Sequence, residues 1–224
     1  MKTLLLWDID GTLIASGGAG MRALRTALRD VFGVDGSLDD IDFAGRTDRW
    51  IMRQIFVKFS LPMQEEKFAR YFEGYVNALP AELVNPQARV LPGVRAILAA
   101  AAQGGFVQGL LTGNMRRGAQ TKLQHHGLWD YFAFGAFADD GELRNDLAPH
   151  ALRRAIAYAG VEFQTDRTWV IGDTPHDIAC GKIIGARTLG VATGGRDLDS
   201  LRAHTPTALL PDLADTDAVL RLLS

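Results

Sequence analysis

The sequence predicts an α/β fold in which a doubly wound parallel sheet carries an inserted helical domain. Short apolar runs that end in Gly, Asp, Thr or Asn alternate with stretches of helical spacing. This alternation stops over residues 16–87, where only helical patterns occur. The chain of 224 residues is 47% hydrophobic and 22% charged, so it is apolar enough to bury a core. These features are typical of a globular α/β protein with helices on both faces of the sheet.

Five short apolar runs are predicted to form the strands. They span residues 3–7, 106–111, 168–171, 187–191 and 208–210. The helices that cross over between them are predicted at residues 94–102, 116–126, 148–158 and 176–184. Strands that alternate with helices in this way form a parallel sheet.

The segment 16–87 is predicted to be a separate helical domain. Apolar residues recur at helical spacing in three stretches, 21–32, 51–59 and 68–79. Pro80, Pro86 and Pro92 mark the return of the chain to the sheet. The α/β core is therefore expected to be discontinuous, with residues 1–15 and 88–224 on either side of the insertion.

Charge and cysteine content exclude several classes of protein. The chain has 24 basic and 26 acidic residues, a net charge of −2, which provides no broad electrostatic surface for nucleic acid or membranes. The lone Cys180 cannot form an internal disulfide. The apolar run at residues 4–7 is too short for a signal peptide. We expect a cytoplasmic protein without nucleic-acid or membrane partners.

Four carboxylates follow two of the predicted strands. Asp8 and Asp10 come after the first strand, and Asp173 and Asp177 come after the strand at 168–171. Ligands of open parallel sheets bind outside the carboxyl ends of the strands, so these acids are expected to converge. Each like pair at ~4 Å costs on the order of 4 kcal/mol at an effective dielectric of 20. A cation must offset this repulsion, and hard oxygen ligands suit Mg²⁺. Helix capping is the alternative for any one of these acids, but it does not explain both motifs together.

A third polar group follows the strand at 106–111. Thr112, Gly113 and Asn114 lead into the next helix, where a hydroxyl, a flexible residue and free backbone N–H groups can hold a phosphate. The same residues also suit an ordinary helix N-cap, and the two interpretations remain open at this point.

Together, these motifs resemble those of the haloacid dehalogenase superfamily. The resemblance lies in Asp-Ile-Asp-Gly-Thr-Leu at 8–13, Leu-Thr-Gly-Asn at 111–114 and Gly-Asp-Thr-Pro-His-Asp at 172–177, in this order. It is nearest to phosphoglycolate phosphatase-like members that carry a helical cap between the first two motifs. It implies a Rossmann-like core and a cap at residues 16–87.

The resemblance also implies a role for each residue of the motifs. Asp8 would be the nucleophile that forms an aspartyl phosphate, and Asp10 the general acid and then the general base. Asp8, Asp173 and the main-chain carbonyl of Asp10 would bind Mg²⁺, with Asp177 as a direct ligand or as outer support. The phosphoryl group would be held by Thr112, Gly113 and Asn114.

Members of the superfamily also use a basic residue, usually lysine, ahead of the helix that precedes the last motif. No lysine occurs in that region here. Arg144 is the candidate, because a guanidinium can bridge a phosphate and a carboxylate. Lys122, on the helix after Thr112, is the alternative. In the cap, the loop 43–48 carries Arg46, which is expected to bind the leaving group of the substrate.

These assignments predict a Mg²⁺-dependent phosphatase that acts on a small phosphorylated metabolite. Dehalogenases of the superfamily lack the second aspartate, so Asp10 argues against them. Phosphonatases need a cap lysine, and Lys58 and Lys67 both lie outside the loop 43–48. Two alternatives remain: a sugar-phosphate mutase, which shares the core chemistry, and a catalytically silent regulatory protein built on the same fold.

Overall fold

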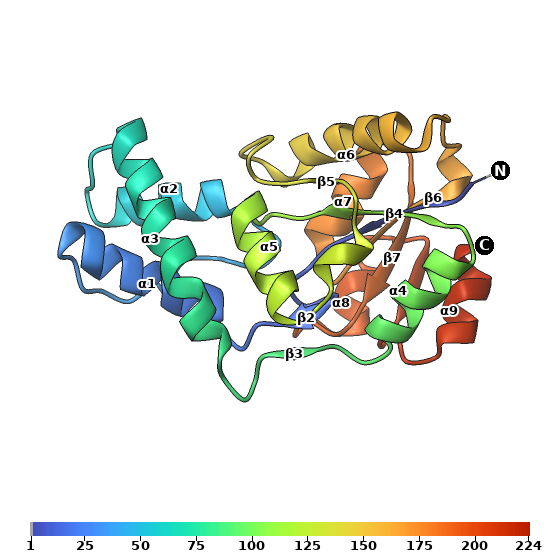
Figure 1. The fold of residues 1–224 in the computed structure, drawn as a ribbon, viewed down its shortest axis with the longest axis horizontal. Coiled ribbons are helices and arrows are strands. Elements are labelled where there is room, and N and C mark those ends of the chain that lie inside the picture. Colours follow the sequence, from blue (N-terminus) through green and yellow to red (C-terminus); the bar gives the residue numbers. More distant parts are fainter. Residues whose placement is uncertain (1) are drawn as a thin grey trace.

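The first strand lies in the middle of a six-stranded parallel sheet. The computed structural model describes residues 2–224 (Figure 1). The strand order is β5-β4-β1-β6-β7-β8. The bounds are β1 (Leu4–Trp7), β4 (Val107–Leu111), β5 (Gly135–Ala136), β6 (Thr168–Gly172), β7 (Arg187–Val191) and β8 (Ala208–Leu210). The five predicted strands are confirmed, whereas β5 was missed because two small residues make no apolar run.

Helices cover both faces of this sheet, as the α/β interpretation predicted. Leu5 and Trp7 of β1 face a core cluster shared with α4 (Val94–Gln103), α5 (Arg116–His125) and α9 (Thr216–Leu223). Leu4 and Leu6 point to the opposite face, which is covered by α6 (Arg144–Ala159) and α7 (Pro175–Ile183). Alternate residues of a strand face opposite sides, so a doubly covered strand is apolar throughout. The remaining short elements are α8 (Leu198–Arg202) and the 3₁₀ turns at Trp129–Tyr131 and Thr165–Arg167.

Three helices of the inserted segment pack around a core of their own. They are α1 (Ala19–Phe32), α2 (Asp48–Lys58) and α3 (Glu65–Leu83), and they lie beside one end of the sheet in Figure 1. Their shared cluster is built from buried residues between positions 19 and 83. The segment is joined to the sheet by β2 (Ile14–Ala15), which pairs antiparallel with β3 (Arg89–Val90). The domain boundaries at 15/16 and 87/88 remain predictions.

Two helices that extend beyond their expected bounds contain a proline. Helix α3 continues through Pro80 to Leu83, although the sequence placed the end of the helix at this proline. Leu79 and Leu83 are both buried in the helical cluster, and this packing outweighs the one backbone hydrogen bond that the proline cannot donate. Helix α6 starts four residues earlier than predicted, at Arg144, and contains Pro149. Within residues 2–224, no helix has the length and apolar character needed to cross a membrane.

Candidate active site

The polar residues that follow three neighbouring strands meet at one edge of the sheet. Asp8 follows β1, Thr112 follows β4 and Asp173 follows β6, and β1 lies between the other two strands. The backbone N–H of Asp8 donates to the carbonyl of Ile171 (2.9 Å), so the ladder between β1 and β6 continues to the acid itself. The sheet therefore holds these side chains at fixed positions, as the sequence predicted.

Three carboxylates form a buried group at this edge. One oxygen each of Asp8, Asp173 and Asp177 lies within 4.8 Å of the others. Burial raises the pKa of Asp8 to about 6, although the nearby Arg144 lowers it. Burial also raises the pKa of Asp173 well above its ordinary value, and the charges of Asp177 and Asp8 add to this effect. Asp8 and Asp177 share the Arg144 guanidinium, whereas Asp173 has no basic partner among residues 2–224, and a divalent cation would stabilise such an oxygen-rich group.

Small residues leave space beside Asp173. A Cβ atom at Gly194 would lie 1.7 Å from Asp173 Oδ2, and one at Gly11 would lie 2.5 Å from the same oxygen. Thr12 Oγ1 donates to the other oxygen, Oδ1, at 3.1 Å. In addition, Asp10 Oδ1 is buried without a hydrogen-bond partner in the described structure. The residues present therefore fit a cation held mainly by oxygen atoms.

Asp177 is tied more firmly to the protein than the other two acids. Its Oδ2 accepts hydrogen bonds from the backbone N–H (3.0 Å) and the hydroxyl (2.7 Å) of Thr174, and its Oδ1 accepts from Arg144. With Thr174, it forms the capping box that begins α7. Both carboxylate oxygens of Asp177 therefore already have partners in the protein.

Arg144 is the first residue of α6 and reaches into the centre of the site. Its Nη2 donates to Asp8 Oδ1 (2.8 Å), to the carbonyl of Leu111 (2.9 Å) and to Asp177. Burial opposes its charge, but Asp177 and Asp8 more than compensate and raise the pKa of Arg144 above its usual range. A Cβ atom at Gly113 would lie 3.1 Å from Nη1, so this nitrogen faces the predicted phosphate cradle.

Lys122 lies in the same site and holds the second aspartate. Its Nζ donates to Asp10 Oδ2 and to Asn114 Oδ1, both at 2.6 Å. Asn114 Nδ2 in turn donates to Asp10 Oδ2 (2.8 Å) and to Thr112 Oγ1 (2.9 Å). Burial would raise the pKa of Asp10, but the Lys122 ammonium and these hydrogen bonds lower it below its ordinary value. The two cations that the sequence offered as alternatives are thus both present, each on a different aspartate.

Comparison with known proteins agrees with this geometry. A sequence profile described as haloacid dehalogenase-like hydrolase matches residues 5–182. The chain belongs to this family. It is 29% identical to the probable phosphatase IndB of Dickeya dadantii over 96% of this chain and 92% of the relative. It is 24% identical to a phosphoglycolate phosphatase of Agrobacterium fabrum over 96% of this chain and 90% of the relative. A hydrolase from Pseudomonas syringae has the same fold, with a TM-score of 0.74 and 21% identity over the full length of both chains.

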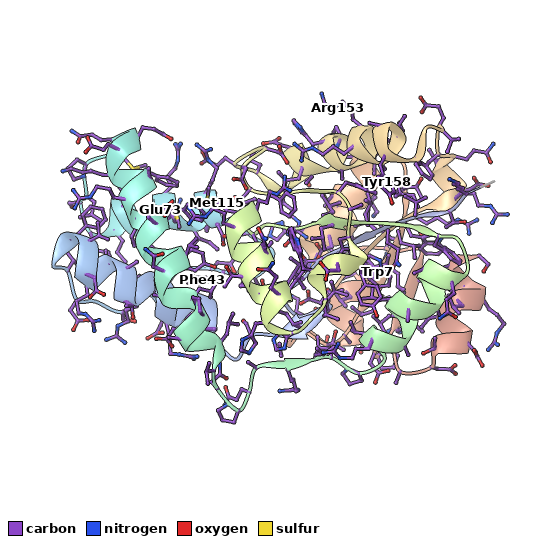
Figure 2. All side chains as sticks on the ribbon, in the orientation of Figure 1. Trp7, Phe43, Glu73, Met115, Arg153 and Tyr158 are labelled. Atoms are coloured by element: carbon purple, nitrogen blue, oxygen red, sulfur yellow. The ribbon has the colours of Figure 1, made fainter. Side chains whose placement is uncertain are left out.

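In this haloacid dehalogenase-like hydrolase, the helical segment also supplies a buried acid that sequence reasoning missed. The backbone N–H of Asp48 donates to the carbonyl of Gly113 (2.7 Å), and its Oδ2 accepts from the N–H of Met115 (2.7 Å). Burial raises the pKa of Asp48 to about 6, although Lys122 lowers it. In Figure 2, Met115 lies at the start of α5, beside the helical segment. Nothing in the local sequence distinguishes Asp48 from an ordinary acid in the first turn of a helix.

Arg46 lines the cavity, but its guanidinium is engaged elsewhere. The group stacks over the ring of Trp50 at 4.5 Å, and Nε donates to Asp42 at 3.3 Å. Its predicted contact with a leaving group requires the side chain to turn away from these partners. Its role in binding substrate remains a prediction.

Proposed function

We propose that this hydrolase is a Mg²⁺-dependent phosphatase that hydrolyses a small phosphomonoester through an aspartyl phosphate on Asp8. The observation that carries the proposal is the division of charge at the end of β1. Asp8 is held by Arg144, and Asp10, two residues further on, is held by Lys122. Asp8 can then act as a nucleophile and Asp10 as a proton carrier, each beside its own cation. This arrangement suits phosphoryl transfer to a carboxylate. The names of the phosphatase relatives support the same reaction.

The metal would be held by Asp8, Asp173 and the main-chain carbonyl of Asp10, with Asp177 as support. When bound, Mg²⁺ supplies positive charge that offsets the phosphate and the carboxylates. Asp173 is held in position by its bond from Thr12, and Asp177 fixes Arg144. Outer contacts of this kind orient the groups that bind a metal.

The phosphoryl group would be held where β4 ends. Thr112, Gly113 and Asn114 provide a hydroxyl, backbone N–H groups and an amide at the start of α5. The free Nη1 face of Arg144 would provide positive charge on the same side. Preorganised donors around a transferring phosphoryl group stabilise its transition state.

The reaction would proceed in two displacements. In the first, a carboxylate oxygen of Asp8 attacks phosphorus, the bond from phosphorus to the leaving oxygen breaks, and Asp10 gives that oxygen a proton. In the second, water attacks phosphorus, its proton passes to Asp10, and the bond from phosphorus to Asp8 breaks. The products are the alcohol and inorganic phosphate, and both aspartates are restored.

Lys122 would tune Asp10 for both displacements. In the free enzyme, the low pKa of Asp10 keeps it ionised. A phosphate dianion arriving beside it raises its pKa and favours the protonated form that the first displacement needs. After the alcohol leaves, the ionised form is available to accept a proton from water.

Residues 16–87 would act as a cap domain that closes over a small phosphorylated metabolite. The loop 43–48 is already anchored at the site. Asp48 forms hydrogen bonds with Gly113 and Met115, and Thr47 Oγ1 donates to the carbonyl of Glu142. Closing a site in this way excludes water other than the attacking molecule.

The proposal is tested by measuring phosphate release from a panel of phosphomonoesters, including p-nitrophenyl phosphate, with Mg²⁺ and with excess chelator. We expect turnover with Mg²⁺ and none with chelator, together with inhibition by vanadate or aluminium fluoride as phosphoryl mimics. Full activity in chelator, or no turnover of any ester, would contradict the proposal.

A further inference from the structure

The site opens into a cavity of about 350 Å³ between the sheet edge and the helical segment, and this cavity is partly open to solvent. This volume is at the lower end of the range for small-molecule sites, so it suits a single small metabolite. The wall opposite the acids is apolar or small. It is built by Gly18, Gly20, Met21, Leu24, Phe43 and Ile51.

The cations that line this cavity are already paired. Within residues 2–224, they are Arg46, Lys122 and Arg144. Lys122 is bonded to Asp10 and Asn114, and Arg144 is bonded to Asp8 and Asp177. Arg46 is stacked on Trp50 and bonded to Asp42. A second negative group on a substrate would therefore have to draw one of these cations away from the partners that it has in this structure.

The helical segment 16–87 also brings an acid and two hydroxyl groups to the cavity. Asp48 is buried, and its carboxylate is fixed by the N–H of Met115. In its ionised form, above its pKa of about 6, Asp48 repels an anionic leaving group. Ser16 and Tyr75 line the same cavity and add uncharged hydroxyl groups. Neutral hydroxyls suit a substrate that carries hydroxyl groups or a ring rather than a charge.

We infer that the preferred substrate is the phosphomonoester of an uncharged, partly apolar alcohol, and that esters whose leaving group bears a carboxylate or a second phosphate are poor substrates. This inference rests on the proposed phosphatase function. A substrate carboxylate that is buried without a partner has a desolvation cost that a hydroxyl largely avoids. Repulsion from the Asp48 carboxylate adds to this cost. An apolar group, by contrast, gains from contact with Met21, Leu24 and Phe43.

Two matched pairs of esters test the inference on the unmodified enzyme. 2-Hydroxyethyl phosphate and 2-phosphoglycolate differ only by CH₂OH in place of a carboxylate, and phenyl phosphate and 4-carboxyphenyl phosphate form an aryl pair. We expect kcat/KM to be at least about tenfold higher for the uncharged member of each pair. Equal values, or a preference for the charged member, would overturn the inference while leaving the phosphatase function intact. If neither the four esters nor p-nitrophenyl phosphate are hydrolysed, both the inference and the proposed phosphatase function are wrong.

A charge added to the wall tests the cause of the preference. Met21 is half-buried on the cavity side of α1, and Met21→Lys places a cation there. We expect it to narrow or reverse the ratio of kcat/KM within each pair. Thr26→Lys, on the same helix but away from the cavity lining, is the matched control and should leave the ratio unchanged. A folded Met21→Lys variant that keeps the parent ratio of kcat/KM within each pair would contradict the inference. If this variant does not fold, the comparison of the two ester pairs on the parent enzyme tests the inference.

Discussion

Two buried cations divide the aspartates of the site between them. Arg144 serves Asp8 and Asp177, whereas Lys122 serves Asp10. The superfamily resemblance predicted one basic residue and left these two as alternatives. A sequence pattern cannot separate them, because the helix that carries Lys122 and the helix that carries Arg144 follow different strands and reach the same edge of the sheet. The three-dimensional structure shows that each has a partner of its own.

Replacement of Lys122 should impair the reaction more than the fold. Lys122→Gln keeps a donor near Asn114 but removes the charge beside Asp10, so we expect kcat to fall by about 10- to 100-fold, the equivalent of one charge-assisted hydrogen bond. The measurement is steady-state hydrolysis of p-nitrophenyl phosphate at saturating Mg²⁺. Lys182→Gln is the control, because Lys182 is exposed and bonds only to His204 and Thr205. Parent-like kcat in Lys122→Gln would argue against the proposed role.

Asp48 should make the stability of the protein depend on pH. Its folded-state pKa of about 6 lies above the ordinary value of 3.8, so protonation favours the folded state. This contribution to stability is lost as the pH rises through about 6. Asp48→Asn removes this titration but keeps an oxygen that can accept from Met115. The unfolding free energy of the parent relative to the variant should therefore fall by about 2 kcal/mol between pH 4.5 and pH 7. Denaturant unfolding at several pH values measures this, and a pH-independent difference would show that Asp48 is not buried as described.

At the level of elements, the sequence was most informative where a motif follows a strand. Parallel strands bring their carboxyl ends to one edge, so the grouping of Asp8, Thr112 and Asp173 was predictable from three local patterns. Contacts that join distant segments were not predictable in this way. The hydrogen bond between Asp48 and Met115 connects the helical segment to α5 and has no local signature. The packing of the helical cluster also overrode Pro80, a signal that taken alone ends a helix.

The loop after β7 gives a test at this scale. A methyl group at Gly194 would collide with Asp173, so Gly194→Ala should displace this carboxylate without strain elsewhere on the backbone. We expect the Mg²⁺ concentration for half-maximal activity to rise at least about tenfold, because one ligand is misplaced. Thermal unfolding without metal serves as the control and should show a much smaller effect. An unchanged Mg²⁺ requirement would place the metal away from Asp173.

On the scale of the whole molecule, the sheet and the helical segment have separate apolar cores and meet around the reacting groups. The clusters that cover the two faces of the sheet are distinct from the cluster shared by α1, α2 and α3. The sequence predicted this organisation from the loss of strand signals over 16–87. It did not predict how the loop 43–48 seats on the sheet edge, because that depends on backbone groups such as the carbonyl of Gly113.

The central claim is that Asp8 attacks phosphorus, and the most direct test compares phosphate release by Asp8→Asn and by the parent enzyme at saturating Mg²⁺. An amide oxygen is a poor nucleophile, so the account predicts that kcat of the variant falls at least about 1000-fold, to the background rate. The variant should remain folded, because the amide keeps the oxygen that accepts from Arg144. Turnover of a folded, uncontaminated Asp8→Asn variant at a substantial fraction of the parent rate would contradict the account.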